Sequence, residues 1–316
     1  IQFDPGVPES NDATDSGVYG DVRSAESNYL AYHLKQTLQG TGHWGAVRVV
    51  PSRSAFTDII VSGIVERSNG EHVTLEISVQ DASGAHWFDR EYTTQTGVSS
   101  YSSTRDRRKD PYQKVFNDIA NDIHAHAQSL SAEETVRIRK ISEMQFFADM
   151  SPIAYGNYLA TDDDGITTIM RLPAENDPTV DRLRQIRERD RLVVDTLNEH
   201  YANFYYGIAI PYRNWRKVTR QESVAYRQVK RSARIQTLVG VVILAGSLAA
   251  ETENSSSSRQ RRVNRSLQNL GIAEGFNRIV GGFQRGSEAV GAAEHHVAPS
   301  RVLSAAGGGK GVANEE

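Results

Sequence analysis

A predicted β-meander at residues 57–96 constrains the fold of this chain more than any other feature. Apolar residues occupy every second position from Val73 to Val79, and polar residues fill the positions between them. This period of two is typical of a strand with one buried face and one solvated face. The Asn69-Gly70 pair just before it is a strong hairpin signal. The predicted strands are residues 59–65, 73–81 and 85–96, the last anchored by Trp87 and Phe88.

Two predicted helices flank the meander. Ser24 is suited to cap the first helix, which Gly40 should end, and Pro111 suits the first turn of the second. Residues 46–51 predict a short strand between the first helix and the meander. The order predicts an α+β fold: a small α/β sandwich with an antiparallel meander, followed by an α-helical region with a long helical hairpin.

The segment from Thr37 to Ala127 is similar to a domain of bacterial cell-envelope proteins. The residues concerned are TLQGTGHWGAVRVVPS, DIIVSGIVERSNGEHVTLEISVQDASGAHWFDREY and VFNDIANDIHAHA. In its order of elements the segment resembles TolB N-terminal regions and CsgG-type envelope lipoproteins. That order is a helix and strand, a V-x-G-x-V strand, a hairpin with a D-x-x-G turn and a closing helix. The resemblance spans about a third of the chain. It implies a cell-envelope setting and a role in assembly, and it carries over no catalytic residue because those domains have none.

The sequence after residue 130 is predicted to be mainly helical. Ser131 and Glu134 form a capping box, and the helix that they open should end before Pro152. Residues 179–206 have a strong helical pattern, which Pro211 is expected to break. The predicted segments are an extended N-terminal arm (1–23), an α/β docking domain (24–130), a helical connector (131–212), a basic and apolar helical hairpin (213–290) and a Gly-rich tail (291–316).

The first arm of the predicted hairpin ends in a short apolar run. Ile235–Ala250 contains sixteen uncharged residues, or about 24 Å of helix at ~1.5 Å per residue. A lone span needs about 20 residues, so the run fits a protein core, partial membrane insertion or an oligomeric collar. The residues concerned are Leu238, Val239, Val241, Val242, Ile243 and Leu244. Basic residues flank the run and would favour anionic lipid headgroups: Arg227, Lys230, Arg231, Arg234, Arg261, Arg262 and Arg265.

The second arm carries a stripe of glycines. Each glycine inside a helix costs about 1 kcal/mol relative to alanine, so four on one face require compensation. Close approach of another helix would supply it. The alternative is a loosely helical segment that these glycines interrupt. The stripe, which we interpret as a helix-packing and oligomer contact, consists of Gly271, Gly275, Gly282 and Gly286.

The sequence contains no recognisable catalytic or metal-binding motif. It has no cysteine, which excludes disulfides, thiolate ligands and cysteine nucleophiles. His124 and His126 are two positions apart and would not share a helix face. The run Asp162–Gly165 resembles part of a calcium loop, but its twelfth position, counted from Asp162, is Pro173 rather than Glu. We therefore interpret it as a helix-to-strand turn with at most weak Ca²⁺ binding. We predict no catalytic residue, cofactor or metal ion.

The expected function is structural. We predict a component of a bacterial cell-envelope complex, such as secretion, motility or surface-fibre machinery, that forms a homo-oligomer or joins a larger complex through its hairpin. The expected location is the periplasm, in association with the outer membrane, and Ile1 in place of Met would fit a processed lipoprotein. A net charge of −3 argues against nucleic acid. The alternative is a soluble periplasmic module that binds a peptide or partner at its sheet edge. An enzyme would need a pocket that gathers His72, Asp89 and Glu91.

Overall fold

The computed structural model describes residues 1–6, 20–51, 56–102 and 109–243, with the side chains of the last helix described through residue 225. Several predicted contact residues lie outside this part: Leu244, Arg261, Arg262, Arg265, Gly271, Gly275, Gly282 and Gly286. Others lie in the last helix and are described by their backbone alone: Arg227, Lys230, Arg231, Arg234, Leu238, Val239, Val241, Val242 and Ile243.

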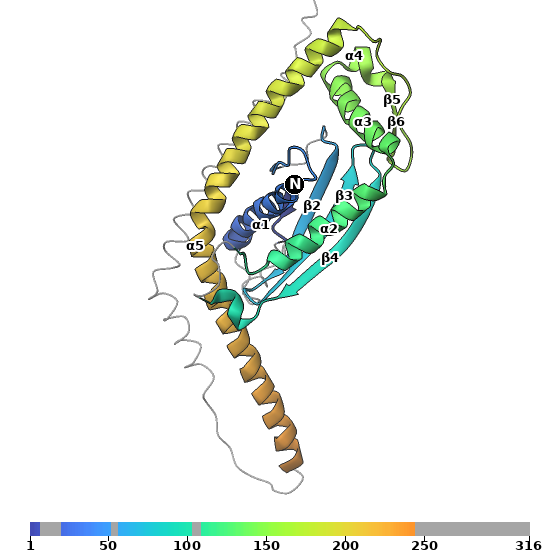
Figure 1. Cartoon of the computed structure of the whole chain (residues 1–316). Helices are drawn as coiled ribbons and strands as arrows, with labels where there is room; N and C mark the ends of the chain where they lie inside the picture. Colours follow the sequence, from blue (N-terminus) through green and yellow to red (C-terminus); the bar gives the residue numbers. More distant parts are fainter. Residues whose placement is uncertain (7–19, 52–55, 103–108, 244–316) are drawn as a thin grey trace, which may run out of the picture.

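The predicted meander is confirmed. Strands β2 (Ile59–Ser68), β3 (His72–Asp81) and β4 (His86–Gln95) are antiparallel neighbours in the order β2-β3-β4. A further strand that the sequence pattern did not indicate, β1 (Gln2–Asp4), pairs in parallel with β2. The mixed sheet and its helices confirm the α+β class (Figure 1).

The prediction of a strand at residues 46–51 was wrong. This segment is extended, but its backbone bonds lead away from the sheet. The N–H of Val49 donates to the side-chain oxygen of Asn198 at 2.9 Å, and the N–H of Val50 donates to the carbonyl of Ile1 at 3.0 Å. β1 takes the place beside β2, so the segment instead connects the N-terminal residues to the last helix.

Two helices cover one face of the sheet (Figure 1). They are α1 (Gly20–Gly40) and α2 (Gln113–Ser129), and the largest hydrophobic cluster of the described residues lies between them and the strands. Fully buried members include Leu30, Leu34, Leu75, Ile77, Phe116 and Ile119. The alternation of buried and exposed residues along β3 is the predicted one.

The predicted start of α1 at Ser24 was wrong, because the helix begins at Gly20. Arg23 explains the difference. Its side chain is buried, donates to the carbonyl of Val65 on β2 at 2.9 Å and lies 3.5 Å from the carboxylate of Glu26. The first turn is therefore held by contacts with the sheet, which a local capping pattern does not reveal.

The opposite face of the sheet is polar. Thr74 and Thr93 share a hydrogen bond at 3.1 Å, and Glu76 lies opposite Glu91 in the register of β3 and β4. Asp89 interacts with His86 at 2.8 Å. His72 sits opposite Gln95 at the far end of the strand pair. The described structure therefore does not gather His72, Asp89 and Glu91 into one pocket.

A smaller unit of short elements follows α2. It contains α3 (Ala132–Met150), α4 (Pro152–Tyr155), a 3-10 turn (Gly156–Tyr158), β5 (Leu159–Thr161) and β6 (Thr167–Ile169). The capping box of Ser131 and Glu134 is formed. The Oδ1 atom of Asp162 accepts from two backbone N–H groups, those of Asp164 and Ile166. The run is a turn, as predicted, but it joins the antiparallel strands β5 and β6 rather than a helix and a strand. No metal-binding group of acidic or histidine side chains occurs among the described residues.

The last helix, α5 (Pro178–Ile243), passes through the proline that was expected to break it. Pro211 has no N–H group to donate to the carbonyl of Gly207. Gly207 is exposed, so water can donate a hydrogen bond to that carbonyl instead. On either side of the proline, Ile208 and Tyr212 are fully buried in the main core. Burial on both sides overrides the local preference, so the helix crosses the predicted boundary at residue 212.

One stripe of α5 packs against α1, and the C-terminal end of the helix extends past the α/β body (Figure 1). The stripe repeats at three- and four-residue spacing, as expected for one helix face. It consists of Tyr201, Phe204, Ile208 and Tyr212. Near the start of the helix, Val180 and Leu183 pack with α3 and α4 in a separate cluster. The helix therefore packs against both the α/β body and the smaller unit that follows α2.

Candidate functional site

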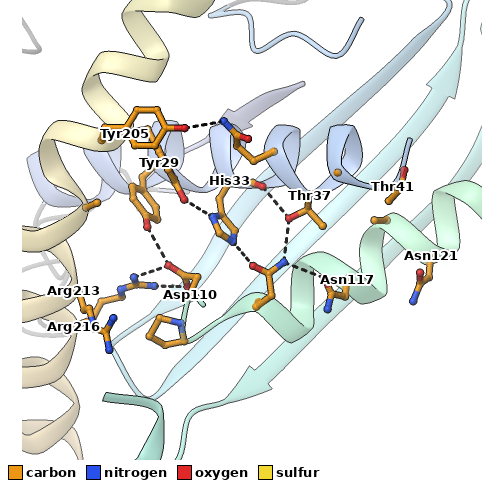
Figure 2. A pocket seen from close by; sticks show the side chains of 17 residues that line it. Tyr29, His33, Thr37, Thr41, Asp110, Asn117, Asn121, Tyr205, Arg213 and Arg216 are labelled. Carbon is orange, nitrogen blue, oxygen red and sulfur yellow. Dashed lines mark hydrogen bonds and ion pairs between the residues drawn. The ribbon is translucent and has the colours of Figure 1, made fainter. Parts of the chain in front are cut away.

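The helices α1, α2 and α5 meet around a cleft of about 750 Å³ (Figure 2). α1 contributes Tyr29 and His33, the residues that lead into α2 contribute Asp110, and α5 contributes Tyr205 and Arg216. These residues come from three separate parts of the sequence. The cleft exists only when α5 is docked on the body.

A buried ion pair forms the floor of this cleft. The two terminal nitrogens of Arg216 donate to the two carboxylate oxygens of Asp110 at 2.9 Å and 2.8 Å. The Arg216 side chain is fully buried and that of Asp110 is 4% exposed. A bidentate pair of this kind fixes orientation as well as charge. It therefore sets the rotation of α5 relative to the start of α2.

The surroundings of the pair keep both groups charged. Burial alone would raise the pKa of Asp110, but the Arg216 guanidinium outweighs it and holds the pKa well below its usual range. Burial disfavours charged Arg216, but Asp110 raises its pKa above the usual value. The guanidinium also lies over three aromatic rings, 4.2 Å from the centroid of Tyr212, 4.9 Å from that of Tyr112 and 5.6 Å from that of Tyr29.

Hydrogen bonds connect this pair to α1. The hydroxyl of Tyr29 donates to Asp110 at 3.0 Å. His33, one turn further on, contacts the hydroxyl of Tyr205 at 2.7 Å and the amide oxygen of Gln113 at 2.8 Å. Since the amide oxygen can only accept, Nε2 of His33 carries the hydrogen and Nδ1 accepts from Tyr205.

The chemistry available here favours anchoring and binding over catalysis. Burial lowers the pKa of His33, which keeps the ring neutral, and both of its nitrogens are already engaged. Burial raises the pKa of Tyr29, so its hydroxyl remains protonated and donates to Asp110. No lining residue is serine or cysteine. The arrangement is a polar network that joins helices, although Nε of Arg216 is buried without a hydrogen-bond partner among the described residues.

A second buried carboxylate anchors the same turn of α5. Glu26 of α1 accepts from the hydroxyls of Tyr212 on α5 and Ser68 on β2. Its pKa is raised by burial, and this effect is opposed by Arg23 and by the two hydroxyl groups. Glu26 thereby links α1, α5 and β2.

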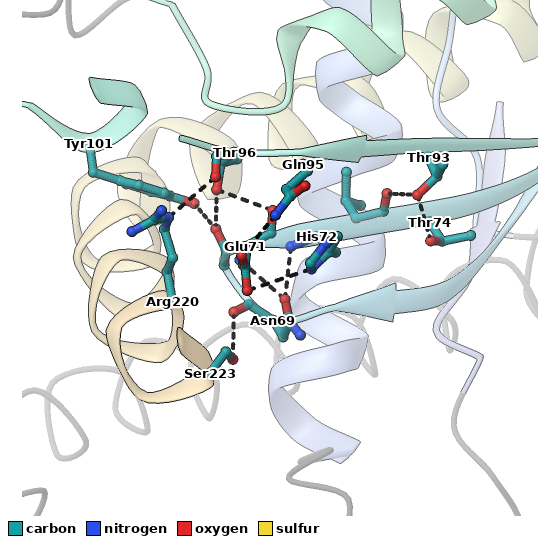
Figure 3. A network of polar contacts seen from close by, with 12 residues as sticks. Asn69, Glu71, His72, Thr74, Thr93, Gln95, Thr96, Tyr101, Arg220 and Ser223 are labelled. Atoms are coloured by element: carbon teal, nitrogen blue, oxygen red, sulfur yellow. Dashed lines mark hydrogen bonds and ion pairs between the residues drawn. The ribbon is translucent and has the colours of Figure 1, made fainter. Parts of the chain in front are cut away.

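The β2–β3 turn forms the third contact with α5 (Figure 3). Gly70 has a φ of +74°, and a Cβ added there would lie 2.0 Å from the carbonyl oxygen of Arg216 and 2.9 Å from the N of Arg220. The turn therefore touches the helix backbone directly. Only glycine fits both the backbone conformation and the space.

Polar contacts surround this close approach. The hydroxyls of Tyr101 and Thr96 donate to the carbonyl of Gly70 at 2.6 Å and 2.8 Å. From α5, Arg220 donates to the carbonyl of Thr96 at 3.4 Å, and Ser223 donates to that of Asn69, also at 3.4 Å. Residues 201–223 of α5 are thus held by apolar packing, the buried ion pair and the turn. We call this set of contacts the α5 anchor.

None of the predicted site residues is among the described residues that line the cleft. The predicted basic flank begins at Arg227, directly after the α5 anchor on the same helix. Sequence reasoning missed Asp110 and Arg216, because one sits at the end of a polar loop and the other in a basic run with many solvated neighbours. The aromatic density from Tyr201 to Trp215 was the available signal for a buried segment.

The histidines of α2 have structural roles. His126 stacks on Trp87 with ring centroids 4.5 Å apart, and His124 stacks on His43 at 3.9 Å. Asp122, which has helical spacing to His126, instead interacts with Arg90 and accepts from Tyr92. Asp122 and His126, which have helical spacing, thus contact different neighbours in the described structure.

Comparisons with protein-family models, with curated proteins and with solved structures found no match for this chain. The similarity to TolB and CsgG domains therefore stays a prediction from the sequence. The function of this chain is therefore inferred from its own residues.

Along the described part of the chain, no helix combines the length and the apolar character needed to cross a membrane.

We predict that Arg216→Met lowers the free energy of unfolding by about 3–5 kcal/mol, because it leaves a buried carboxylate without its partner. The combined variant Arg216→Met, Asp110→Asn should lose less than the sum of the two single changes. Urea denaturation measures all three. Additive losses would contradict the coupling.

The matched control is the exposed pair of Arg48 and Asp195, which also joins the body to α5, at 2.6 Å. The Asp195 side chain is 52% exposed. Asp195→Ala should change stability by less than about 1 kcal/mol. An equal loss in the control would contradict a special role for the buried pair.

We also predict that Gly70→Ala is more destabilising than Gly165→Ala by about 2 kcal/mol, because only the first creates a clash. Both glycines have positive φ, but a Cβ at Gly165 would meet nothing within 4 Å. The comparison therefore separates contact with α5 from backbone strain. Urea denaturation again provides the measurement, and equal losses would show that the turn does not press against the helix.

Proposed function

We propose that this chain is a non-catalytic assembly component of a bacterial cell-envelope complex. In this proposal the α/β body holds the base of α5, and the part of the chain from residue 213 to residue 290 makes contacts with other copies or partner proteins. One observation carries the proposal: α5 is anchored through residues 201–223 and continues to Ile243 beyond the body (Figure 1).

The energetics of a projecting helix support this proposal. Most of the stability of a helix in a protein comes from tertiary packing rather than from intrinsic propensity. Ser223 holds α5 to the body by donating to the carbonyl of Asn69. The sequence beyond it becomes apolar from residue 235. An apolar surface of this kind requires a partner.

The envelope setting rests on the sequence resemblance and on the charge pattern. The predicted periplasmic location, in association with the outer membrane, remains part of the proposal. Basic residues between 227 and 234 precede the apolar run, which would favour contact with anionic lipid. Fractionation of cells, followed by detection of the chain in membrane and soluble fractions, tests the location.

A second candidate function is supported by β4. This strand is an edge of the four-stranded sheet, and no other described strand pairs with its outer side. A soluble module could bind a peptide there by strand addition. The charged centre of β4, with Asp89, Arg90 and Glu91 in succession, opposes indiscriminate pairing.

The assembly proposal predicts that the full chain in mild detergent has a mass well above the 35.0 kDa of one copy. Replacing Leu238 and Val242 with aspartate should reduce that mass, because charge in an apolar contact is costly. Light scattering coupled to size exclusion measures it.

The control is Leu192→Asp, at an exposed leucine of the same helix, which should assemble normally. A monomeric full chain at micromolar concentration would contradict the proposal. So would normal assembly of the variant with both aspartates. If such a monomer binds a peptide, the result would favour the second candidate function, a soluble module that binds at the edge of its sheet.

A further inference from the structure

The walls of the cleft between α1, α2 and α5 are lined by uncharged polar side chains. α1 and its end contribute Gln36, Thr37 and Thr41, and α2 contributes Gln113, Asn117 and Asn121. Amide and hydroxyl groups both donate and accept hydrogen bonds. A volume of about 750 Å³ lies within the range of small-molecule sites.

Charged ligands fit this cleft poorly. The carboxylate of Asp110 and the guanidinium of Arg216 at the floor neutralise each other. His33 is kept neutral by burial, which lowers its pKa. Arg213 is the one other charged residue among the described lining residues. The floor therefore presents no net charge to a ligand, and Arg213 is the remaining group of the described lining that an anion could contact.

Apolar ligands fit poorly as well. The aliphatic residues of the described lining are small: Pro111, Ala120 and Ala209. A lipid tail or an apolar helix would require larger apolar surfaces, because hydrophobic affinity scales with buried apolar area. The exposed apolar surface of the cleft is instead aromatic.

An exposed tyrosine is held at the edge of the cleft. The side chain of Tyr206 is 63% exposed, and its ring lies edge-on to that of Tyr205 with centroids 5.3 Å apart. Its hydroxyl accepts from the amide of Gln36 at 3.4 Å. The ring thus combines an apolar face with a polar tip, and its neighbours restrict its position.

Asparagine side chains remain available at the α2 wall (Figure 2). Within the described residues, Oδ1 of Asn117 accepts from Gln113 at 3.0 Å, and no side-chain hydrogen bond engages Asn121. These groups lie on helices rather than on loops, so little ordering is needed when they bind a ligand. Hydrogen-bonding amides and an exposed aromatic ring therefore face one cleft.

We propose that this cleft binds a short uncharged carbohydrate. The C–H face of a pyranose ring would stack on Tyr206, while its hydroxyl or acetamido groups would exchange hydrogen bonds with Asn117 and Asn121. This binding does not use the proposed assembly contacts, because the described α5 residues that line the cleft end at Arg216, before the apolar run that begins at residue 235. It requires the docked position of α5, since Tyr206 lies on that helix.

The test is titration of the full chain with two neutral trisaccharides, chitotriose and maltotriose, followed by calorimetry and ligand-observed NMR. At least one of them should bind saturably below about 10 mM. Tyr206→Ala and Asn121→Ala should each raise its dissociation constant about tenfold. Asn203→Ala is the matched control at an exposed asparagine of α5 outside the cleft, and it should bind like the unmodified chain.

Sialyllactose and inorganic phosphate form the charged arms of the same titration. Binding of these charged probes alone would overturn the proposal, as would no saturable binding of either trisaccharide. Equal affinity in Tyr206→Ala and Asn121→Ala would place any binding elsewhere and would overturn it too. Both changes are at exposed side chains, and unchanged thermal unfolding verifies that the variants remain folded.

Discussion

The ion pair of Arg216 and Asp110 is the interaction on which the arrangement of this molecule depends. It is fully enclosed, so its strength comes from geometry and from the tyrosines around it rather than from its charges alone. A buried pair rarely adds much stability over apolar packing, but it strongly penalises misalignment. Here it admits one rotation and one register of α5 against α1 and α2.

This constraint explains how a helix with unfavourable local features remains continuous. Pro211 removes a hydrogen bond near the middle of α5, yet the buried residues on both sides of it are fixed to the body. The turn at Gly70 then contacts the helix backbone just beyond the ion pair. A helix anchored in this way can transmit the orientation of the body to its projecting end. That property suits an assembly component, and it also forms the cleft that we propose binds carbohydrate.

Features set by local sequence were predictable, and features set by distant contacts were not. The meander follows from alternation and from the Asn69-Gly70 turn, and the capping box at Ser131 depends on residues three positions apart. The parallel pairing of Gln2–Asp4 with β2 joins residues about sixty positions apart. A strand of three residues also has too short a sequence pattern to be predicted locally. Arg216 and Asp110 are 106 positions apart. Their charges looked solvated in sequence, and only the fold reveals that they are buried together.

The most direct test of this account is the distance between the body and the far side of the α5 anchor. The chain lacks cysteine, so the variant Glu91→Cys, Gln228→Cys carries spin labels at two defined positions. The distance distribution measured by double electron–electron resonance should be narrow, and Arg216→Met should broaden it. A broad distribution in the otherwise unchanged chain would show that α5 is not held by the anchor, and the account would then fail.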